Sequence, residues 1–224
     1  MLKRILVKKV TILGTTGAGK TTFLQALFGD FQKNDVKRNV KLEKRTNVDF
    51  TPVERVQFDN STTTISLNVI SAIMARTRFN SIIMKKAEHR HEIDFSEVDE
   101  ARQVIFNDPA GQERFGFMQE ISVKGADLVI IMADGTNISS IQKISYYLDL
   151  VALEEQRSNK NIPIVIFVNK SDLKSKGIYL GKEIVEQIIS SYDREVIIYE
   201  TSNFQKKTLE EPMAIISNFL LLEE

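Results

Sequence analysis

Three of the ten glycines in this chain, Gly14, Gly17 and Gly19, fall within six positions between an apolar run and an amphipathic one. Glycine weakens both helices and strands, so such a cluster indicates a local demand on the backbone. From Gly14 to Thr21 the sequence reads GTTGAGKT, which matches GxxxxGK[ST] at every fixed position. The match predicts a strand, a loop that closes around a phosphate group, and a helix that begins directly behind the loop.

The chemistry of this loop follows from its residue types. Successive backbone N–H groups can surround an anion, and the helix N-terminus adds partial positive charge. Lys20 can reach the β and γ phosphates of a nucleotide, and the Thr21 hydroxyl can ligate Mg²⁺. The predicted phosphate-binding residues are Gly17, Ala18, Gly19, Lys20, Thr21 and Thr22. A glycine-rich turn beside an unrelated lysine is the alternative interpretation.

Short apolar runs alternate with helical patterns along the rest of the chain. Strands are predicted at residues 5–13, 64–74, 103–107, 128–133, 162–168 and 196–199. Helices are predicted at residues 20–28, 138–156, 180–191 and 209–222. The middle strands are apolar without alternation, which is typical of strands buried on both faces of a mostly parallel sheet. The pattern predicts a three-layer α/β fold with helices on both faces of the sheet.

Two stretches do not follow this alternation. Residues 29–63 are polar and basic, and residues 76–102 begin basic and end acidic. Either could hold a short strand or helix, and neither shows a second core. We therefore expect a single domain over residues 1–224 with insertions or mobile loops at about 29–63 and 76–102. Within the second stretch, EHRHE at residues 88–92 lacks the i, i+4 spacing of a helical zinc site, so an exposed loop is expected there.

Composition narrows the range of partners and locations. Thirty basic residues balance thirty acidic ones, so no global attraction to nucleic acid is expected. There is no cysteine, which excludes disulfides and lipid attachment through a thiol. The longest apolar runs, LVIIMA and IPIVIFV, fall far short of the roughly 20 residues that span a bilayer. A cytoplasmic protein without a lipid anchor or transmembrane segment is expected.

A second motif follows the predicted strand at 103–107, where the chain reads VIFNDPAGQERFGFM. An aspartate at the end of a strand, Asp108, can hold Mg²⁺ through water. Gly111 can offer its N–H to a γ phosphate, and the Gln112 amide can orient a water in line with the γ phosphorus. A simple turn built on Pro109 and Gly111 is the alternative.

The run DPAGQERF resembles the DTAGQERF signature of Ras-like small GTPases, especially those of the Rab branch. The one departure is Pro109, where threonine is usual. This variant is also similar to prokaryotic relatives of the Ras superfamily, which read GQERF followed by an aromatic residue and FM. The resemblance covers about residues 5–30 and 62–222, and it implies a P-loop NTPase fold that binds GTP, GDP and Mg²⁺.

The run PIVIFVNKSD then carries the NKxD motif of the same family at the end of an apolar strand. The resemblance implies that Asp172 accepts hydrogen bonds from guanine N1–H and the exocyclic amine. It implies that Asn169 fixes the loop and contacts N7 or O6, and that the Lys170 stem packs over the base. Adenine presents the opposite donor and acceptor pattern, so a buried carboxylate rejects it. Alone, NKSD could also be a helix N-cap or a plain loop.

Further on, the stretch VIIYETSN resembles the family element ETSA that closes over guanine. Ser202 matches this element, whereas Asn203 and Phe204 replace the usual Ala-Lys. The resemblance implies that the backbone N–H of Asn203 contacts guanine O6.

A Ras-like switch also requires a threonine that binds Mg²⁺ and senses the γ phosphate, and two candidates are present. Thr64 stands directly before a clear strand pattern, in TTTISLNV. Thr46, in RTNVDFTP, would leave a polar stretch where that strand should be. We favour Thr64 on the strand pattern, so that Thr21, Thr64 and Asp108 are the expected metal-binding residues.

Together these motifs predict a GTP-hydrolysing switch in which Gln112, Lys20 and Thr64 act in catalysis. No built-in arginine finger is identifiable, so hydrolysis should be slow without an activating protein. The resemblance to the prokaryotic branch implies a roadblock-type activating protein, beside an effector. Three alternatives stay open: a P-loop ATPase or kinase, a guanine-nucleotide-binding interaction module with little hydrolysis, and a translation-type GTPase.

Overall fold

The computed structural model describes residues 6–28, 67–111 and 116–221. The strands are β1 (Leu6–Leu13), β2 (Asn68–Thr77), β3 (Ile82–Lys86), β4 (Val98–Asp108), β5 (Leu128–Asp134), β6 (Ile164–Asn169) and β7 (Ile197–Glu200). The α-helices are α1 (Lys20–Phe28), α3 (Gly116–Val123), α4 (Ile138–Gln142), α5 (Ile144–Ser158), α6 (Glu183–Ile189) and α7 (Lys207–Leu221). Short 3₁₀ helices are η1 (Ala87–Glu92), η2 (Phe95–Glu97) and η4 (Ser171–Lys176).

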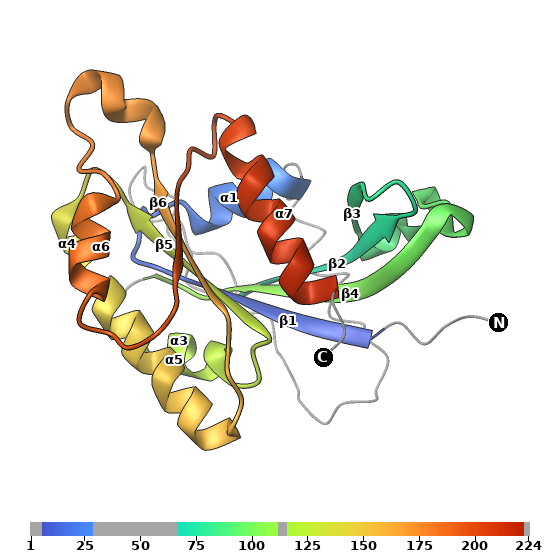
Figure 1. The fold of residues 1–224 in the computed structure, drawn as a ribbon, viewed down its shortest axis with the longest axis horizontal. Helices are drawn as coiled ribbons and strands as arrows, with labels where there is room; N and C mark the ends of the chain where they lie inside the picture. Colours follow the sequence, from blue (N-terminus) through green and yellow to red (C-terminus); the bar gives the residue numbers. More distant parts are fainter. Residues whose placement is uncertain (1–5, 29–66, 112–115, 222–224) are drawn as a thin grey trace.

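The described strands form one seven-stranded sheet in the order β3-β2-β4-β1-β5-β6-β7 (Figure 1). The strand β2 is antiparallel to both of its neighbours, and the other adjacent pairs are parallel. The predicted mixed, mostly parallel α/β sheet of a P-loop NTPase is therefore confirmed. Because β1, β4, β5 and β6 are parallel neighbours, their carboxyl ends lie along one edge of the sheet, where such folds place their sites.

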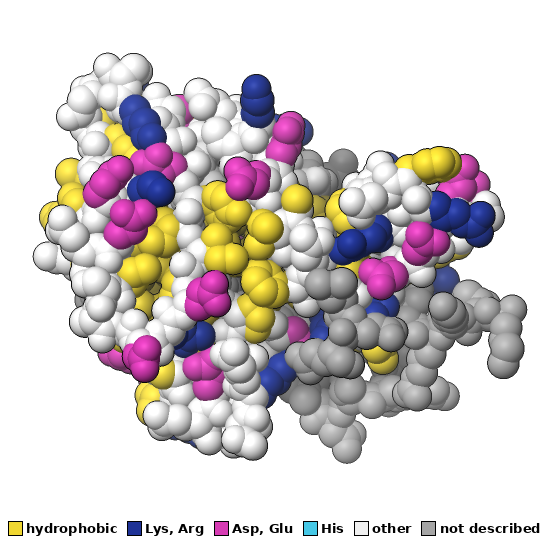
Figure 2. All heavy atoms as spheres, in the orientation of Figure 1, with side chains coloured by type: hydrophobic (Ala, Val, Ile, Leu, Met, Phe, Trp, Pro, Cys, Tyr) yellow, Lys and Arg dark blue, Asp and Glu magenta, His cyan; other side chains and the backbone are white. Residues whose placement is uncertain are grey.

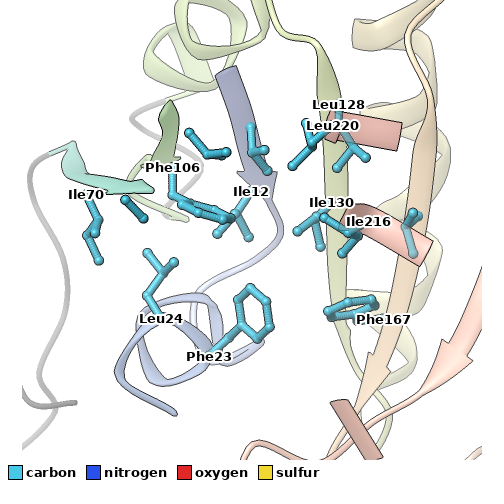
Figure 3. Close-up of a cluster of buried hydrophobic side chains, with 14 of the residues drawn as sticks. Ile12, Phe23, Leu24, Ile70, Phe106, Leu128, Ile130, Phe167, Ile216 and Leu220 are labelled. Atoms are coloured by element: carbon cyan, nitrogen blue, oxygen red, sulfur yellow. The ribbon is translucent and has the colours of Figure 1, made fainter. Parts of the chain in front are cut away.

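Helices cover both faces of this sheet. On one face α1 and α7 pack against a cluster that includes Phe23, Phe106 and Ile216, and on the other α3, α4, α5 and α6 pack against a second cluster. In the first cluster the rings of Phe23 and Phe167 meet edge to face with centroids 5.4 Å apart, and this contact joins α1 to β6 (Figure 3). Every residue of β5 and β6 is buried, as their unbroken apolar sequences predict.

The structure differs from the expected elements at several boundaries. The single helix expected at 138–156 is divided at Lys143 into α4 and α5, and Asn137 caps α4 through its side chain. The strand β4 begins at Val98 rather than at residue 103, because it pairs with β2 back to Thr77. The helix α3 (Gly116–Val123) was not expected. It places Gln119 and Val123 in the interior.

The stretch 76–102 is largely ordered into the sheet. It contains β3, η1, η2 and the first part of β4, and both strands pair with β2, whereas an insertion or mobile loop was expected there. A tight turn with Asn80 at φ 59° connects β2 to β3. EHRHE forms the exposed helix η1, and among the described residues no group of histidine and acidic side chains could hold a metal ion. The stretch 29–63 lies outside the described residues.

Charged side chains of both signs are interspersed over the face of the molecule in Figure 2. Within residues 6–28, 67–111 and 116–221, no helix combines the length and the apolar character needed to cross a bilayer.

Candidate functional site

The motif residues meet at the carboxyl edge of the parallel strands. Asp108, Asp134 and Asn169 are the last residues of β4, β5 and β6. The glycine-rich loop connects the end of β1 to Lys20, the first residue of α1. Motifs that are far apart in the sequence thus converge on one loop, which we call the P-loop (residues 14–21).

The P-loop requires glycine at positions 14 and 19. A Cβ on Gly14 would overlap the Met132 carbonyl of β5, and Gly14 has a φ of +150°. Gly19 has a φ of +101°, and a Cβ there would lie 2.7 Å from the side-chain nitrogen of Asn203. A side chain at either position would therefore be strained and would also displace a neighbour.

Lys20 lies inside this loop, with its ammonium group almost fully buried. Its Nζ donates to the carbonyl oxygens of Gly14 at 2.9 Å and Thr15 at 3.1 Å. Burial lowers the pKa of Lys20, and the nearby Asp108 carboxylate acts in the opposite direction. A cation held this way by two weak neutral acceptors is well placed to exchange them for phosphate oxygens.

A polar cluster lies where α1 meets β4. Asp108 Oδ2 accepts hydrogen bonds from Thr21 Oγ1 at 2.6 Å and from Asn68 Nδ2 at 3.0 Å. The other carboxylate oxygen, Oδ1, is buried and has no hydrogen-bond partner among the described residues. An unsatisfied buried carboxylate oxygen beside a hydroxyl is the donor set that Mg²⁺ prefers, so these residues fit the metal that the motif implies. Asn68 was not predicted, since nothing in the sequence singles out the first residue of β2.

Gly111 packs directly on the P-loop. A Cβ on Gly111 would lie 2.5 Å from Lys20 Nζ and 2.7 Å from backbone atoms of Thr15 and Thr16. The side-chain amide of Gln119 in α3 donates to the carbonyl of Ala110 at 3.2 Å and holds the same segment from behind. The DPAG segment is thus in main-chain contact with the phosphate loop.

Asn169 connects the end of β6 to the P-loop. Its Nδ2 donates to the carbonyl of Ala18 at 2.9 Å, and its Oδ1 accepts from the backbone N–H of Asn203 at 3.3 Å. The Asn203 side chain in turn donates to the carbonyl of Gly19 at 2.9 Å. The NKSD motif and the TSN element are therefore bonded to each other and to the phosphate loop.

The other residues of the NKSD motif and of the TSN element lie beside Asn169. Asp172 Oδ1 accepts from the Ser202 hydroxyl at 2.6 Å, which also accepts from the Phe204 N–H at 3.3 Å. Lys170 has a left-handed backbone with φ 71°, and its ammonium group pairs with Asp134.

Asp134 was missed by the sequence analysis, although it ends an apolar strand as Asp108 does. Burial favours a higher pKa for Asp134, but hydrogen bonds from Lys170 and Thr136 outweigh it and the pKa is lowered. Its carboxylate thus stays ionised and orients the Lys170 side chain. A charged residue at the end of LVIIMAD is the signal that could have found it.

A second missed contact joins the P-loop to α4. The hydroxyls of Thr15 and Ser140 lie 2.6 Å apart, and Ser140 Oγ also accepts from the Asp134 N–H at 2.9 Å. No sequence motif marks Ser140.

Of the four remaining candidates, the structure describes one. Thr22 lies in the first turn of α1, partly buried. Gln112, Thr64 and the alternative Thr46 lie outside the described residues.

Comparison with known proteins gives one family. The sequence model described as Ras family matches residues 63–220, which is more than half of the chain. The matched range contains DPAG, NKSD and TSN, and it begins after the P-loop, whose motif is an independent observation. The comparison with curated proteins returns no match. With the P-loop, the sheet order and the converging motifs in place, the extent of this match shows that the chain belongs to the Ras family.

Proposed function

We propose that this protein is a molecular switch that binds GTP and GDP with Mg²⁺ and hydrolyses GTP to GDP and phosphate. One observation carries the proposal most directly. The phosphate loop, the Asp108 strand end and the NKSD loop are joined by side-chain hydrogen bonds from Thr21, Asn169 and Asn203. A single bound molecule can therefore contact a phosphate site and a base site at once.

The phosphates would lie on the backbone N–H groups of residues 17–22, with Lys20 transferring its donors from the loop carbonyls to phosphate oxygens. Thr21 and Asp108 would hold Mg²⁺, together with Thr64 as the switch threonine. The metal neutralises charge on the phosphates when it is bound. The fit of these residues to the metal is supported by the unsatisfied Asp108 oxygen.

Guanine would be selected at the NKSD loop. Asp172 would accept from two guanine donors, and the Ser202 hydroxyl that now bonds its Oδ1 would fix the carboxylate orientation. The Lys170 stem would pack over the base, held by Asp134, and the Asn203 N–H would reach O6. Adenine would leave these polar groups unpaired, of which Asp172 is partly and Ser202 fully buried, and this is the strong form of rejection.

Switching would involve the DPAG segment. Its backbone touches the P-loop at Thr15 and Thr16, so a γ phosphate held between these two main chains would displace Gly111. Gln112 directly follows and would orient the attacking water. Loss of the γ phosphate would let the segment return, and this change would be the signal read by an effector.

Hydrolysis is tested by single-turnover phosphate release from GTP, with ATP in parallel. We expect slow release from GTP and none from ATP, and a lower rate in Gln112→Leu. Equal rates in Gln112→Leu and the parent would show that Gln112 has no catalytic part. Absence of release from bound GTP would favour the alternative of a nucleotide-binding interaction module. Addition of a roadblock-type activating protein, the partner that the resemblance implies, should raise the rate.

A further inference from the structure

We propose that Asn203 is a positioning residue: its side chain connects the base site, formed by the NKSD motif and the TSN element, to the P-loop, and this connection slows nucleotide release. The proposal rests on the proposed function, since it concerns how the same site holds its nucleotide. It goes further because it assigns a role to the Asn203 side chain, whereas the family resemblance implies only a backbone contact.

Two consecutive P-loop carbonyls each accept a hydrogen bond from a carboxamide. Ala18 accepts from Asn169, which ends β6, and Gly19 accepts from Asn203, which follows β7, both at 2.9 Å. The two asparagines are also joined, through the Asn203 N–H and Asn169 Oδ1. Asn169, Asn203 and the P-loop are thus each bonded to the other two. Asn203 provides a second connection between the base site and the P-loop, beside the one from Asn169.

The orientation of the Asn203 carboxamide is determined by its surroundings. A carbonyl oxygen such as that of Gly19 only accepts, so the side-chain nitrogen must face it. The side chain is buried, and its Oδ1 has no hydrogen-bond partner among the described residues. A buried acceptor without a donor is unfavourable, so the Gly19 contact is the interaction that favours an asparagine here.

The geometry of Gly19 supports the same conclusion. A Cβ on Gly19 would overlap Asn169 Nδ2 and lie 2.7 Å from Asn203 Nδ2. Both carboxamides are therefore packed against one position of the backbone. Alanine, the usual residue at position 203 in the resembled element, has no donor for the Gly19 carbonyl.

The consequence is kinetic. The two loops hold opposite ends of a nucleotide, which leaves only when they separate. One buried neutral hydrogen bond across this boundary should change the release rate by roughly two- to tenfold. Affinity differences of this kind appear mainly in dissociation rates.

The experiment compares the wild type with Asn203→Ala and Asn203→Leu. Dissociation of a fluorescent GDP analogue, mant-GDP, is followed after addition of excess GDP with Mg²⁺ present. We expect both variants to release mant-GDP about two- to tenfold faster than the wild type. Asn203→Leu keeps the branched shape of the side chain, with bulkier methyl groups, and loses the donor, so a wild-type rate in this variant would show that packing and not the hydrogen bond matters, and would overturn the proposal.

A matched control and a second ligand separate positioning from general damage. Ser217→Ala removes another buried side-chain hydrogen bond, from Ser217 Oγ to the Ala214 carbonyl in α7, and should leave the release rate unchanged. Inorganic pyrophosphate occupies only the phosphate end, so its competition constant should be the same in Asn203→Ala and the wild type. Equal weakening of pyrophosphate and GDP would show a distorted P-loop and contradict the role of a connection between loops.

Failure of this inference is distinguishable from failure of the proposed function. Wild-type protein that binds mant-GDP, with unchanged release in Asn203→Ala, would overturn the inference alone. Wild-type protein that retains no mant-GDP would overturn the proposed function and this inference together.

Discussion

The hydroxyl of Thr21 donates a 2.6 Å hydrogen bond to Oδ2 of Asp108, so the first turn of α1 is bonded to the last residue of β4. These residues are 87 positions apart in the sequence. The bond leaves Oδ1 of the carboxylate buried and unsatisfied among the described residues, beside the Thr21 hydroxyl. The first prediction follows from this arrangement.

Thr21→Val should reduce the effect of Mg²⁺ on nucleotide retention. Valine keeps the volume of threonine and removes both the hydroxyl ligand and the hydrogen bond to Asp108. We expect the ratio of mant-GDP affinities with and without Mg²⁺ to fall by about tenfold or more, since a hydrogen bond to a charged group is worth about 1.5–3 kcal/mol. Thr77→Val serves as the control. Thr77 ends β2, far along the strand from Asn68, which contacts Asp108, and its hydroxyl accepts a hydrogen bond from the Ser81 N–H. An unchanged Mg²⁺ dependence in Thr21→Val would place the metal elsewhere.

Lys20 should make the stability of the nucleotide-free protein depend on pH. Burial lowers its pKa from the ordinary 10.5, against the raising effect of Asp108, so the unfolded chain binds more protons than the folded one. The cost of the buried charge is present below the folded-state pKa and is relieved as pH rises toward 10.5. The free energy of unfolding should therefore rise with pH in this window, and less steeply in Lys20→Met. Urea titrations at pH 7.5 to 10 measure the slope, and parallel curves for the two proteins would contradict this account.

Gly111→Ala should destabilise the protein through a main-chain clash. The added Cβ would lie 2.7 Å from backbone atoms of Thr15 and Thr16, which cannot rotate away as a side chain could. We expect the free energy of unfolding to fall by about 1–3 kcal/mol, the usual cost of overpacking. Gly116→Ala is the control, because among the described residues its Cβ would meet only the Tyr146 hydroxyl, at 3.4 Å. Equal stability of the two variants would mean that Gly111 does not pack on the P-loop.

Arg194→Leu should cost more than the loss of an exposed ion pair. Arg194 contacts both carboxylate oxygens of Glu155 at 3.1 Å and donates to the carbonyl of Ile162 at 3.0 Å, and both charged side chains are largely buried. Removal of these charge-assisted bonds should lower the free energy of unfolding by about 2 kcal/mol. Lys182→Met, which breaks an exposed i, i+4 pair with Glu186, should cost about 0.5 kcal/mol or less. Chemical denaturation of both variants gives the comparison, and similar losses would refute the distinction.

The central strands and the P-loop could be predicted because their signals are local. The runs LVIIMA and IPIVIFV are long, apolar and flanked by polar residues, and they became the fully buried β5 and β6. The glycine positions of GTTGAGKT reflect a backbone requirement that no other residue meets, so they appear in the sequence itself.

The supporting contacts could not be predicted because they depend on tertiary pairing. Asn68 bonds to Asp108 only because β2 and β4 pair in a register that places these two residues opposite each other. Asn203 was expected to act through its backbone, whereas its side chain reaches Gly19 across 184 positions of sequence. The early start of β4 likewise follows from its pairing with β2. The roles of Gln112 and Thr64 stay predictions from sequence.

The most direct test of the central claim is equilibrium binding of mant-GDP to the full chain with Mg²⁺ present. The account predicts saturable binding of one nucleotide per chain at micromolar or lower concentration, displaced by GDP or GTP and far less by ADP or ATP. Absence of saturable binding, or equal displacement by adenine nucleotides, would contradict the claim that the P-loop and the NKSD loop form one guanine-nucleotide site.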